Sequence, residues 1–143
     1  MDINEGAFNA LMQEIHTTAK EKGFWDNKER NVGEMLMLIV SELGEALEAY
    51  RTDKRFTNEK YNQAVRFEYS QTKYISSETK QLYTDAQTQI FLRAVKDTFE
   101  DELADVFIRL VDLAAGLGIN LYWHIQQKMY YNKTREKLHG KKF

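Results

Sequence analysis

Apolar residues recur every three or four positions along most of this chain, which is the spacing of amphipathic helices. The pattern predicts four helices, over about 3–22, 32–50, 98–115 and 121–137. Gly23 and Gly116-Leu117-Gly118 are the expected stops, and Asn31 and Asn120 are the expected N-caps. We therefore expect an all-α fold, an antiparallel helix bundle of about four core helices, as a single domain spanning 1–143.

The segment between the second and third of these helices, about 52–96, is harder to interpret. A helical pattern resumes only from about Thr84-Asp85, through Ile90, Phe91, Ala94 and Val95. Val65, Phe67 and Tyr69 alternate with polar residues, which suits a strand, and Tyr74-Ile75 would then be a return strand. Residues 59–69 suit a short helix equally well. Because the segment is rich in aromatic residues, we interpret it as an insert that acts as a lid or contacts a partner.

The amino-acid composition excludes several classes of structure and function. The chain has no proline and no cysteine, so helices are favoured and disulfides, thiolate metal sites and cysteine nucleophiles are excluded. A formal net charge of −2 gives no basic field for a nucleic acid polymer. No apolar run has the length of a membrane span, and the first ten residues do not read as a signal peptide. We expect a soluble cytoplasmic protein without a membrane partner.

Two acidic pairs stand out within the apolar helices. Glu42 and Glu45 lie three residues apart on one predicted helix, and Glu102 and Asp105 repeat the spacing on another. Residues at this spacing share a helix face, so an antiparallel packing would bring four carboxylates together. The opposite faces are apolar, with Leu36, Ile39, Val40, Leu43 and Leu47 on one helix and Leu103, Val106, Phe107 and Leu110 on the other. Such a cluster needs protons or cations, and oxygen ligands suit Mg²⁺ or Mn²⁺.

The last predicted helix carries His124, Lys128, Asn132 and Arg135 along one narrow stripe. Two cations and an amide donor suit a multiply charged anion, although a solvated helix face explains each residue alone. A cationic stripe together with a metal site is what a nucleotide polyphosphate needs. Upstream, the aromatic connector Phe24-Trp25-Asp26 either covers the end of a core or offers a stacking surface for a planar ligand.

The sequence lacks the residues that several other kinds of active site require. The chain has no G-x-x-x-x-G-K-[ST] motif, and with three histidines and no cysteine a zinc site is not expected. The one Glu-x-x-His, Glu136 to His139, falls at a helix end and does not make a di-iron bundle. His16 is interpreted as a packed or surface residue.

The acidic motifs resemble those of the MazG-like all-α nucleoside triphosphate pyrophosphohydrolases. That family has Glu-Glu-x-x-Glu on one helix and Glu-x-x-Asp on the next; here the two read Ser41-Glu42-Leu43-Gly44-Glu45 and Glu102-Leu103-Ala104-Asp105. The aromatic connector before the first motif, the Lys128-x-x-x-Asn132 spacing and the basic ending agree with the family as well. Two features depart from it: Ser41 replaces the first Glu, and the spacer between the motifs is much longer than in short members.

The resemblance implies a homodimer or a dimer of dimers that hydrolyses a nucleoside triphosphate to the monophosphate and pyrophosphate. It implies Mg²⁺ ligands at Glu42, Glu45, Glu102 and Asp105, and we assign the role of base to Glu42 or Glu45. Lys128 and Asn132, with Arg135, would hold the phosphates or sugar, and Trp25 would lie near the base. Two alternatives stay open: a phosphoribosyl-nucleotide pyrophosphohydrolase of the same superfamily, and a non-catalytic helical interaction module.

Overall fold

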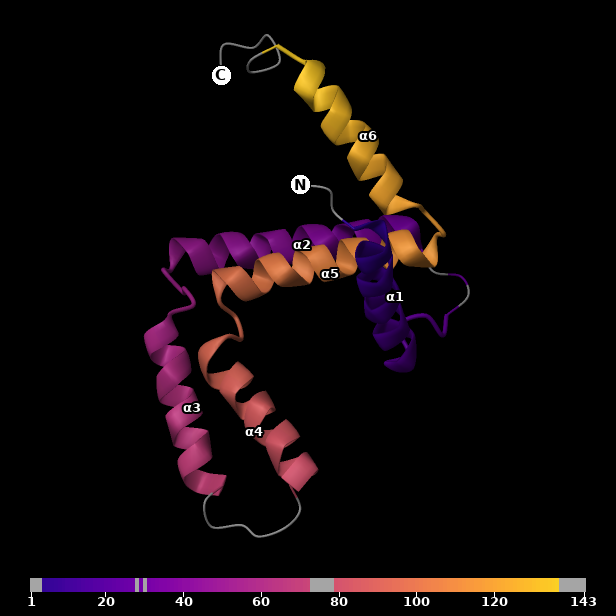
Figure 1. Ribbon diagram of the computed structural model, residues 1–143. Helices are drawn as coiled ribbons and strands as arrows, with labels where there is room; N and C mark the ends of the chain where they lie inside the picture. Colours follow the sequence, from indigo (N-terminus) through magenta and orange to yellow (C-terminus); the bar gives the residue numbers. More distant parts are fainter. Residues whose placement is uncertain (1–3, 28, 30, 73–78, 137–143) are drawn as a thin grey trace. The chain divides into compact units, whose positions relative to one another are not determined.

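The computed structural model describes residues 4–27, 29, 31–72 and 79–136, and over these residues the chain is entirely helical apart from its connections. Six helices follow one another in this part of the chain: α1 (Glu5–Glu21), α2 (Val32–Arg51), α3 (Asn58–Thr72), α4 (Thr79–Ala94), α5 (Phe99–Gly116) and α6 (Leu121–Thr134) (Figure 1). The prediction of an all-α chain is confirmed. Two more helices, α3 and α4, lie in the insert, and α4 covers most of the stretch from 84 to 95 where the sequence predicts a helical pattern.

The helices form two compact units. One unit combines the chain up to Met35 with the chain from Ile108 onward, and the other is Leu36–Phe107. Most of α2 and the first half of α5 therefore belong to the second unit, together with α3 and α4. All four acidic motif residues lie in that second unit.

In the first unit, side-chain caps set the helix boundaries that the sequence predicts. The Asn4 carboxamide oxygen accepts from the Gly6 and Ala7 N–H groups at the start of α1, and Asn120 accepts from the Trp123 N–H at the start of α6. Gly23 follows α1 with a φ of 81°, a left-handed conformation that glycine adopts without a Cβ clash. Helices α1 and α6 touch through the Phe8 and Tyr122 rings, whose centroids lie 6.0 Å apart.

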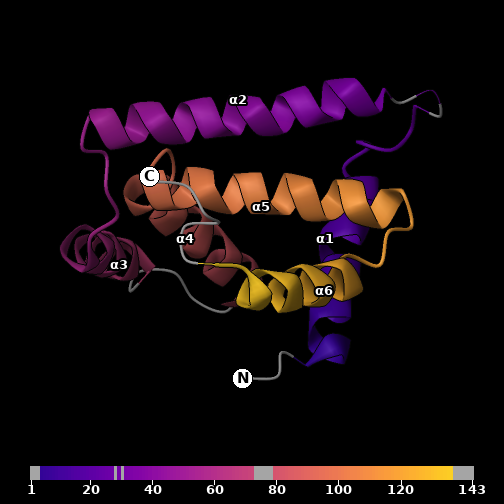
Figure 2. The ribbon, with the colours of Figure 1, turned by 90° about the horizontal axis from the view of Figure 1, so that it is seen from above.

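The second unit contains two antiparallel pairs of helices. Helices α2 and α5 run side by side in opposite directions, and α3 and α4 form a hairpin (Figures 1 and 2). The connection after α2 is tied to the start of α5, because the Phe99 N–H donates to the Lys54 carbonyl at 2.9 Å. The Glu100 carboxylate accepts from the Arg55 side chain and from the Phe56 N–H.

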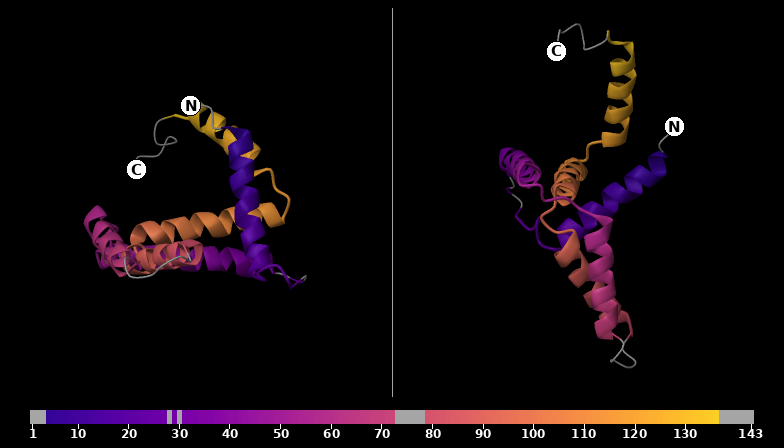
Figure 3. Two further views of the ribbon diagram at one scale, coloured as in Figure 1. Left: turned by 60° about the horizontal axis from the view of Figure 1, so that its bottom comes forward. Right: turned by 90° about the vertical axis from the view of Figure 1, so that its left-hand side faces the viewer.

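The insert is a helical hairpin, so the predicted strand over Val65 to Tyr69 is wrong and the alternative, a helix, is confirmed (Figure 3). The hairpin core consists of Ala64, Ile90 and Ala94, with Tyr61 and Val65 packed against it. Phe67 and Tyr69, which suggested a strand, are about half exposed. The proposed return strand at Tyr74-Ile75 lies outside the described residues.

Small residues line the inward face of α2. Ile39, Ala46 and Ala49 are buried there, and Glu42 is buried on the same face. The larger apolar residues point the other way, because Leu36, Val40, Leu43, Leu47 and Tyr50 are 47–60% exposed. A helix bundle would bury the apolar face that the sequence predicts for this helix, but of its five residues only Ile39 is buried. The leucine face remains uncovered in the described part of the chain.

Candidate metal centre

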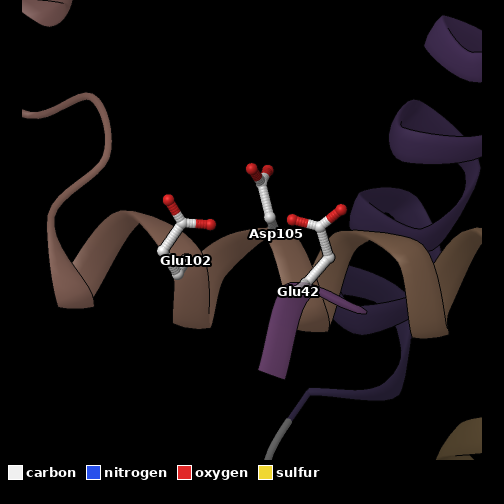
Figure 4. A group of neighbouring side chains, drawn as sticks. All are labelled: Glu42, Glu102 and Asp105. Carbon is white, nitrogen blue, oxygen red and sulfur yellow. The ribbon is translucent and has the colours of Figure 1, made fainter. Parts of the chain in front are cut away.

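Helices α2 and α5 bring three of the four predicted acidic side chains together. Glu42 and Glu102 are buried, and Asp105 is half-buried. One carboxylate oxygen from each lies within 4.8 Å of the other two, and all three groups project to the same side of α5 (Figure 4). Opposite ligands of an octahedral Mg²⁺ lie about 4.2 Å apart at metal–oxygen distances of ~2.1 Å, so only small side-chain adjustments separate this arrangement from a ligand set.

Local sequence explains why these carboxylates face the seam. Glu42 occupies the same helical face as Ile39, Ala46 and Ala49, which brings it toward the neighbouring helix. On α5, Thr98 is the N-cap; its hydroxyl accepts from the Asp101 N–H at 3.3 Å, and its carbonyl accepts from the Glu102 N–H at 3.0 Å. Glu102 therefore projects from the first turn of a well-capped helix.

The electrostatics of the cluster favour a bound cation. The pKa of Glu102 is raised above its ordinary value, first because the carboxyl is desolvated and then because the charges of Glu45, Asp101, Asp105 and Glu42 oppose its ionisation. A divalent cation would relieve both effects at once, by supplying opposite charge where water is excluded. Oxygen-only ligands, close spacing and burial together fit Mg²⁺ or Mn²⁺.

Glu45 and Ser41, the other two positions of the first motif, are exposed. Glu45 does not belong to the group of three closely spaced carboxylates, although its charge is the largest carboxylate contribution to the raised pKa of Glu102. Glu45 therefore lies at the edge of the centre. Its prediction as a metal ligand stays a prediction, as does the effect of a serine in place of the family's first glutamate.

Trp25 lies in the first unit, where its indole is fixed by a buried carboxylate. The indole Nε1–H donates to both Asp112 oxygens, at 2.9 and 3.0 Å, and His16 Nδ1 lies 2.7 Å from Oδ1 of the same group. The His16 and Trp25 rings meet edge to face with centroids 4.9 Å apart. Gly116 makes room for the indole, because a Cβ at this position would lie 1.9 Å from Trp25 Cη2.

Sequence reasoning missed this cluster. His16 was interpreted as packed or exposed, and its partner Asp112 was not singled out. A signal was present: Asp112 is the one acid within the apolar run Leu110-Val111-Asp112-Leu113-Ala114, and a carboxylate in such a run needs hydrogen-bond donors. Trp25 thus packs as the simpler interpretation of the aromatic connector predicted, while Phe24 beside it is exposed.

The cationic stripe of α6 also lies in the first unit. Lys128 and Asn132 are exposed, and Arg135 is the half-buried C-cap residue of the helix. Lys128 Nζ lies 5.2 Å from the centroid of the Tyr131 ring and the Arg135 guanidinium lies 5.6 Å from it, so both cations share one aromatic surface. The assignment of these residues to a substrate stays a prediction.

Comparison with known proteins assigns the chain to no family. No family model matches the chain, and no curated protein or solved structure matches it significantly. Among the described helices, none is long and apolar enough to cross a membrane. The chain is therefore defined by its fold and its site, as an all-α protein with a carboxylate cluster capable of holding a metal ion.

Proposed function

We propose that this chain is a Mg²⁺-dependent, MazG-like pyrophosphohydrolase that cleaves a nucleoside triphosphate to the monophosphate and pyrophosphate. The observation that carries the proposal is the convergence of Glu42, Glu102 and Asp105 from two antiparallel helices. These residues come from the two acidic motifs on which the family resemblance rests. An ordinary solvated acidic face would leave its carboxylates exposed, whereas two of these three are buried.

The reaction requires mainly that the protein position the substrate and the attacking water and that the phosphate charge be neutralised. A water oxygen attacks the α-phosphorus, the bond from that phosphorus to the bridging oxygen breaks, and pyrophosphate leaves. Bound Mg²⁺ would supply neutralisation of the phosphate charge. Glu42, Glu102 and Asp105 would hold the cation, with Glu45 as the fourth proposed ligand. Glu42 or Glu45 would also accept the proton of the attacking water. Lys128, Asn132 and Arg135 are the proposed phosphate or sugar contacts, and Trp25 is proposed to lie near the base.

A pyrophosphate-release assay tests this proposal. Wild-type protein with Mg²⁺ or Mn²⁺ is given ribo- and deoxyribonucleoside triphosphates, and phosphoribosyl-ATP as a separate arm. Glu42→Gln and Asp105→Asn should abolish release while the helical circular dichroism spectrum is unchanged. Glu48→Gln is the matched control, because Glu48 lies on the same helix but forms only an exposed ion pair with Arg51 at 3.9 Å. Full activity in the first two variants would refute the assignment.

We also propose that the chain associates with a second copy through α2. Its exposed apolar residues Leu36, Val40, Leu43, Leu47 and Tyr50 follow the 4-3-4-3 spacing of a helix–helix seam, which suits an identical helix as partner. Leu103 and Phe107 of α5 are also exposed, so the uncovered apolar residues of this unit are not confined to α2.

Sedimentation velocity tests whether the chain associates with a second copy. Wild-type protein should sediment as a dimer or a larger assembly, and Leu47→Lys should shift it toward the monomer. Leu92→Lys is the control, since Leu92 is similarly exposed but lies on α4. A monomeric wild type would contradict the proposal. The same exposed face favours the second candidate function, a helical interaction module, which gains if calorimetry detects no binding of Mg²⁺ or Mn²⁺.

A further inference from the structure

Five cationic side chains surround one cavity at the base of the α3–α4 hairpin. The cavity measures about 240 Å³ and is lined by Lys54, Arg55, Lys60, Arg93, Ala94, Lys96, Asp97 and Thr98. All of these residues belong to the second unit. Asp97 is the one carboxylate in the lining, so positive charge dominates although the whole chain has a net charge of −2.

The two arginines are held in fixed orientations. Arg55 Nε donates to Glu100 Oε1 at 2.8 Å, and its guanidinium lies 4.7 Å from the centroid of the Phe99 ring. Arg93 Nε donates to Glu68 Oε1 at 2.7 Å and lies 4.6 Å from the Phe67 centroid. The Phe56 N–H, together with Arg55, keeps the pKa of Glu100 below its ordinary value, so this carboxylate stays ionised at neutral pH.

These anchors leave donors available. In each arginine the contact to carboxylate uses Nε, and a guanidinium has four further N–H donors on its terminal nitrogens. Among the described residues, none accepts a hydrogen bond from those terminal nitrogens. Two planar forks fixed by a carboxylate and an aromatic ring are preorganised for an oxyanion, since little side-chain entropy is lost on binding.

Two of the three lysines add charge that no described ion pair offsets. Lys96 pairs with Asp97 at 2.8 Å, whereas Lys54 and Lys60 form no ion pair with any described carboxylate. Backbone groups contribute little, because the N–H groups of Lys96 and Thr98 already donate to carbonyls and that of Asp97 donates to the Asp101 carboxylate. An anion in this cavity would therefore be bound by cationic side chains and not by backbone N–H groups.

We propose that this basic cavity binds a small polyanion of the phosphate class. Its volume is below the ~300–1,000 Å³ of pockets that enclose drug-sized ligands, so it suits the phosphates rather than a whole nucleotide. A neighbouring cavity of about 420 Å³ shares Lys60 and Arg93 and includes Phe67, which leaves room for an organic group attached to the phosphates. The phosphates come either from a free inorganic polyphosphate or from a nucleotide, and the site does not depend on the proposed hydrolysis.

Calorimetry with inorganic tripolyphosphate, in chelator without divalent metal, tests the site on the full chain. Wild type should bind one equivalent, and the double variant Lys54→Gln/Lys60→Gln should bind about tenfold more weakly or worse, since two of five facing charges are lost. Lys20→Gln/Lys22→Gln removes the same charge from the exposed end of α1 and should leave binding unchanged. Lys54→Arg/Lys60→Arg should retain it.

The source of the phosphates follows from competition. Displacement of tripolyphosphate by a nucleoside triphosphate, with amide shifts confined to the cavity lining, indicates nucleotide-borne phosphates; no displacement indicates a free polyphosphate. Both support the site. Equal affinity in wild type and in Lys54→Gln/Lys60→Gln would overturn it, because tripolyphosphate would then bind elsewhere. An equal loss in both glutamine variants would also overturn it, because binding would then be non-specific attraction to lysine. Failure of pyrophosphate release in the preceding assay has no bearing on this result.

Discussion

Adding one methyl group at Gly116 should destabilise the protein, although the position is helical. Alanine is favoured over glycine within a helix by up to ~1 kcal/mol, so propensity alone predicts stabilisation. At this site, however, the new Cβ would lie 1.9, 2.3 and 2.6 Å from three carbon atoms of the Trp25 ring. Distances below 3.0 Å cannot be tolerated, and therefore either the indole or the helix must move.

Movement of the indole costs free energy, because the ring is hydrogen-bonded to Asp112. Displacement weakens two contacts between Nε1–H and a buried carboxylate, and hydrogen bonds to charged groups contribute roughly 1.5–3 kcal/mol. It also uncovers part of a large aromatic ring, whose complete removal from a core costs about 3–5 kcal/mol. After the propensity gain, we expect Gly116→Ala to lose about 2 kcal/mol, or ~5–8 °C in Tm for a chain of this length.

Urea unfolding followed by circular dichroism measures this loss, and Gly44→Ala is the matched control. Gly44 lies within α2 with open space where a Cβ would be, so alanine there should stabilise by roughly 0.5–1 kcal/mol. Opposite signs for the two substitutions are the expected outcome. A neutral or stabilising Gly116→Ala would refute the reasoning, since the indole would then not be fixed against α5.

A double-mutant cycle attributes the effect to the indole. In a Trp25→Ala background the new methyl group has no ring to displace, so Gly116→Ala should cost nothing further, and the coupling energy should be about 2 kcal/mol. The Trp25 fluorescence, isolated in a Trp123→Phe background, should shift on Gly116→Ala as the ring leaves its carboxylate. Additive destabilisation would place the strain elsewhere.

Three further outcomes are expected. Asp112→Asn should cost about 1–3 kcal/mol in urea unfolding, because the amide nitrogen of Asn would face a donor, His16 or Trp25. Ile90→Ala should cost about 2–5 kcal/mol and lower hydrogen-exchange protection in α3 and α4, whereas Phe91→Ala at the exposed neighbour should cost little. Mg²⁺ at a hundredfold its Kd should stabilise wild type by ~2.7 kcal/mol, a chelator should reverse this, and Glu102→Gln should show neither effect.

Local signals in the sequence were enough to predict most helix boundaries. The caps Asn31 and Asn120 and the stop Gly23 lie where helices begin and end, because capping depends on hydrogen bonds within a few residues. The acidic spacing also predicted that four carboxylates would meet, and three of them, Glu42, Glu102 and Asp105, lie close together. Both inferences rest on geometry within one helix or on the pairing of two strongly patterned helices.

The hairpin and the Asp112 cluster were harder to predict for a shared physical reason. The fully buried residues of α3 are Ala64 and Glu68, with Tyr61 and Val65 partly buried beside them. Glu68 forms an ion pair with Arg93 at 2.7 Å. Neither alanine nor glutamate contributes to a hydrophobic period, so the exposed Phe67 dominated the pattern and suggested a strand. Asp112 likewise depends on partners distant in sequence, which no local pattern reveals.

The inward face of α2 carries alanine and glutamate where a core helix would carry leucine. This explains both proposed roles of the helix, in the metal centre and in association. Ala46 and Ala49 share the buried face of α2 with Glu42, whose carboxylate lies close to that of Asp105. A leucine in either alanine position would need more space on this close-packed face. The leucines must then occupy the opposite face, where they are exposed. A helix that turns its alanines inward to assemble a carboxylate cluster therefore presents a hydrophobic outer face, and this is why the proposed metal centre and the proposed association arise from one sequence pattern.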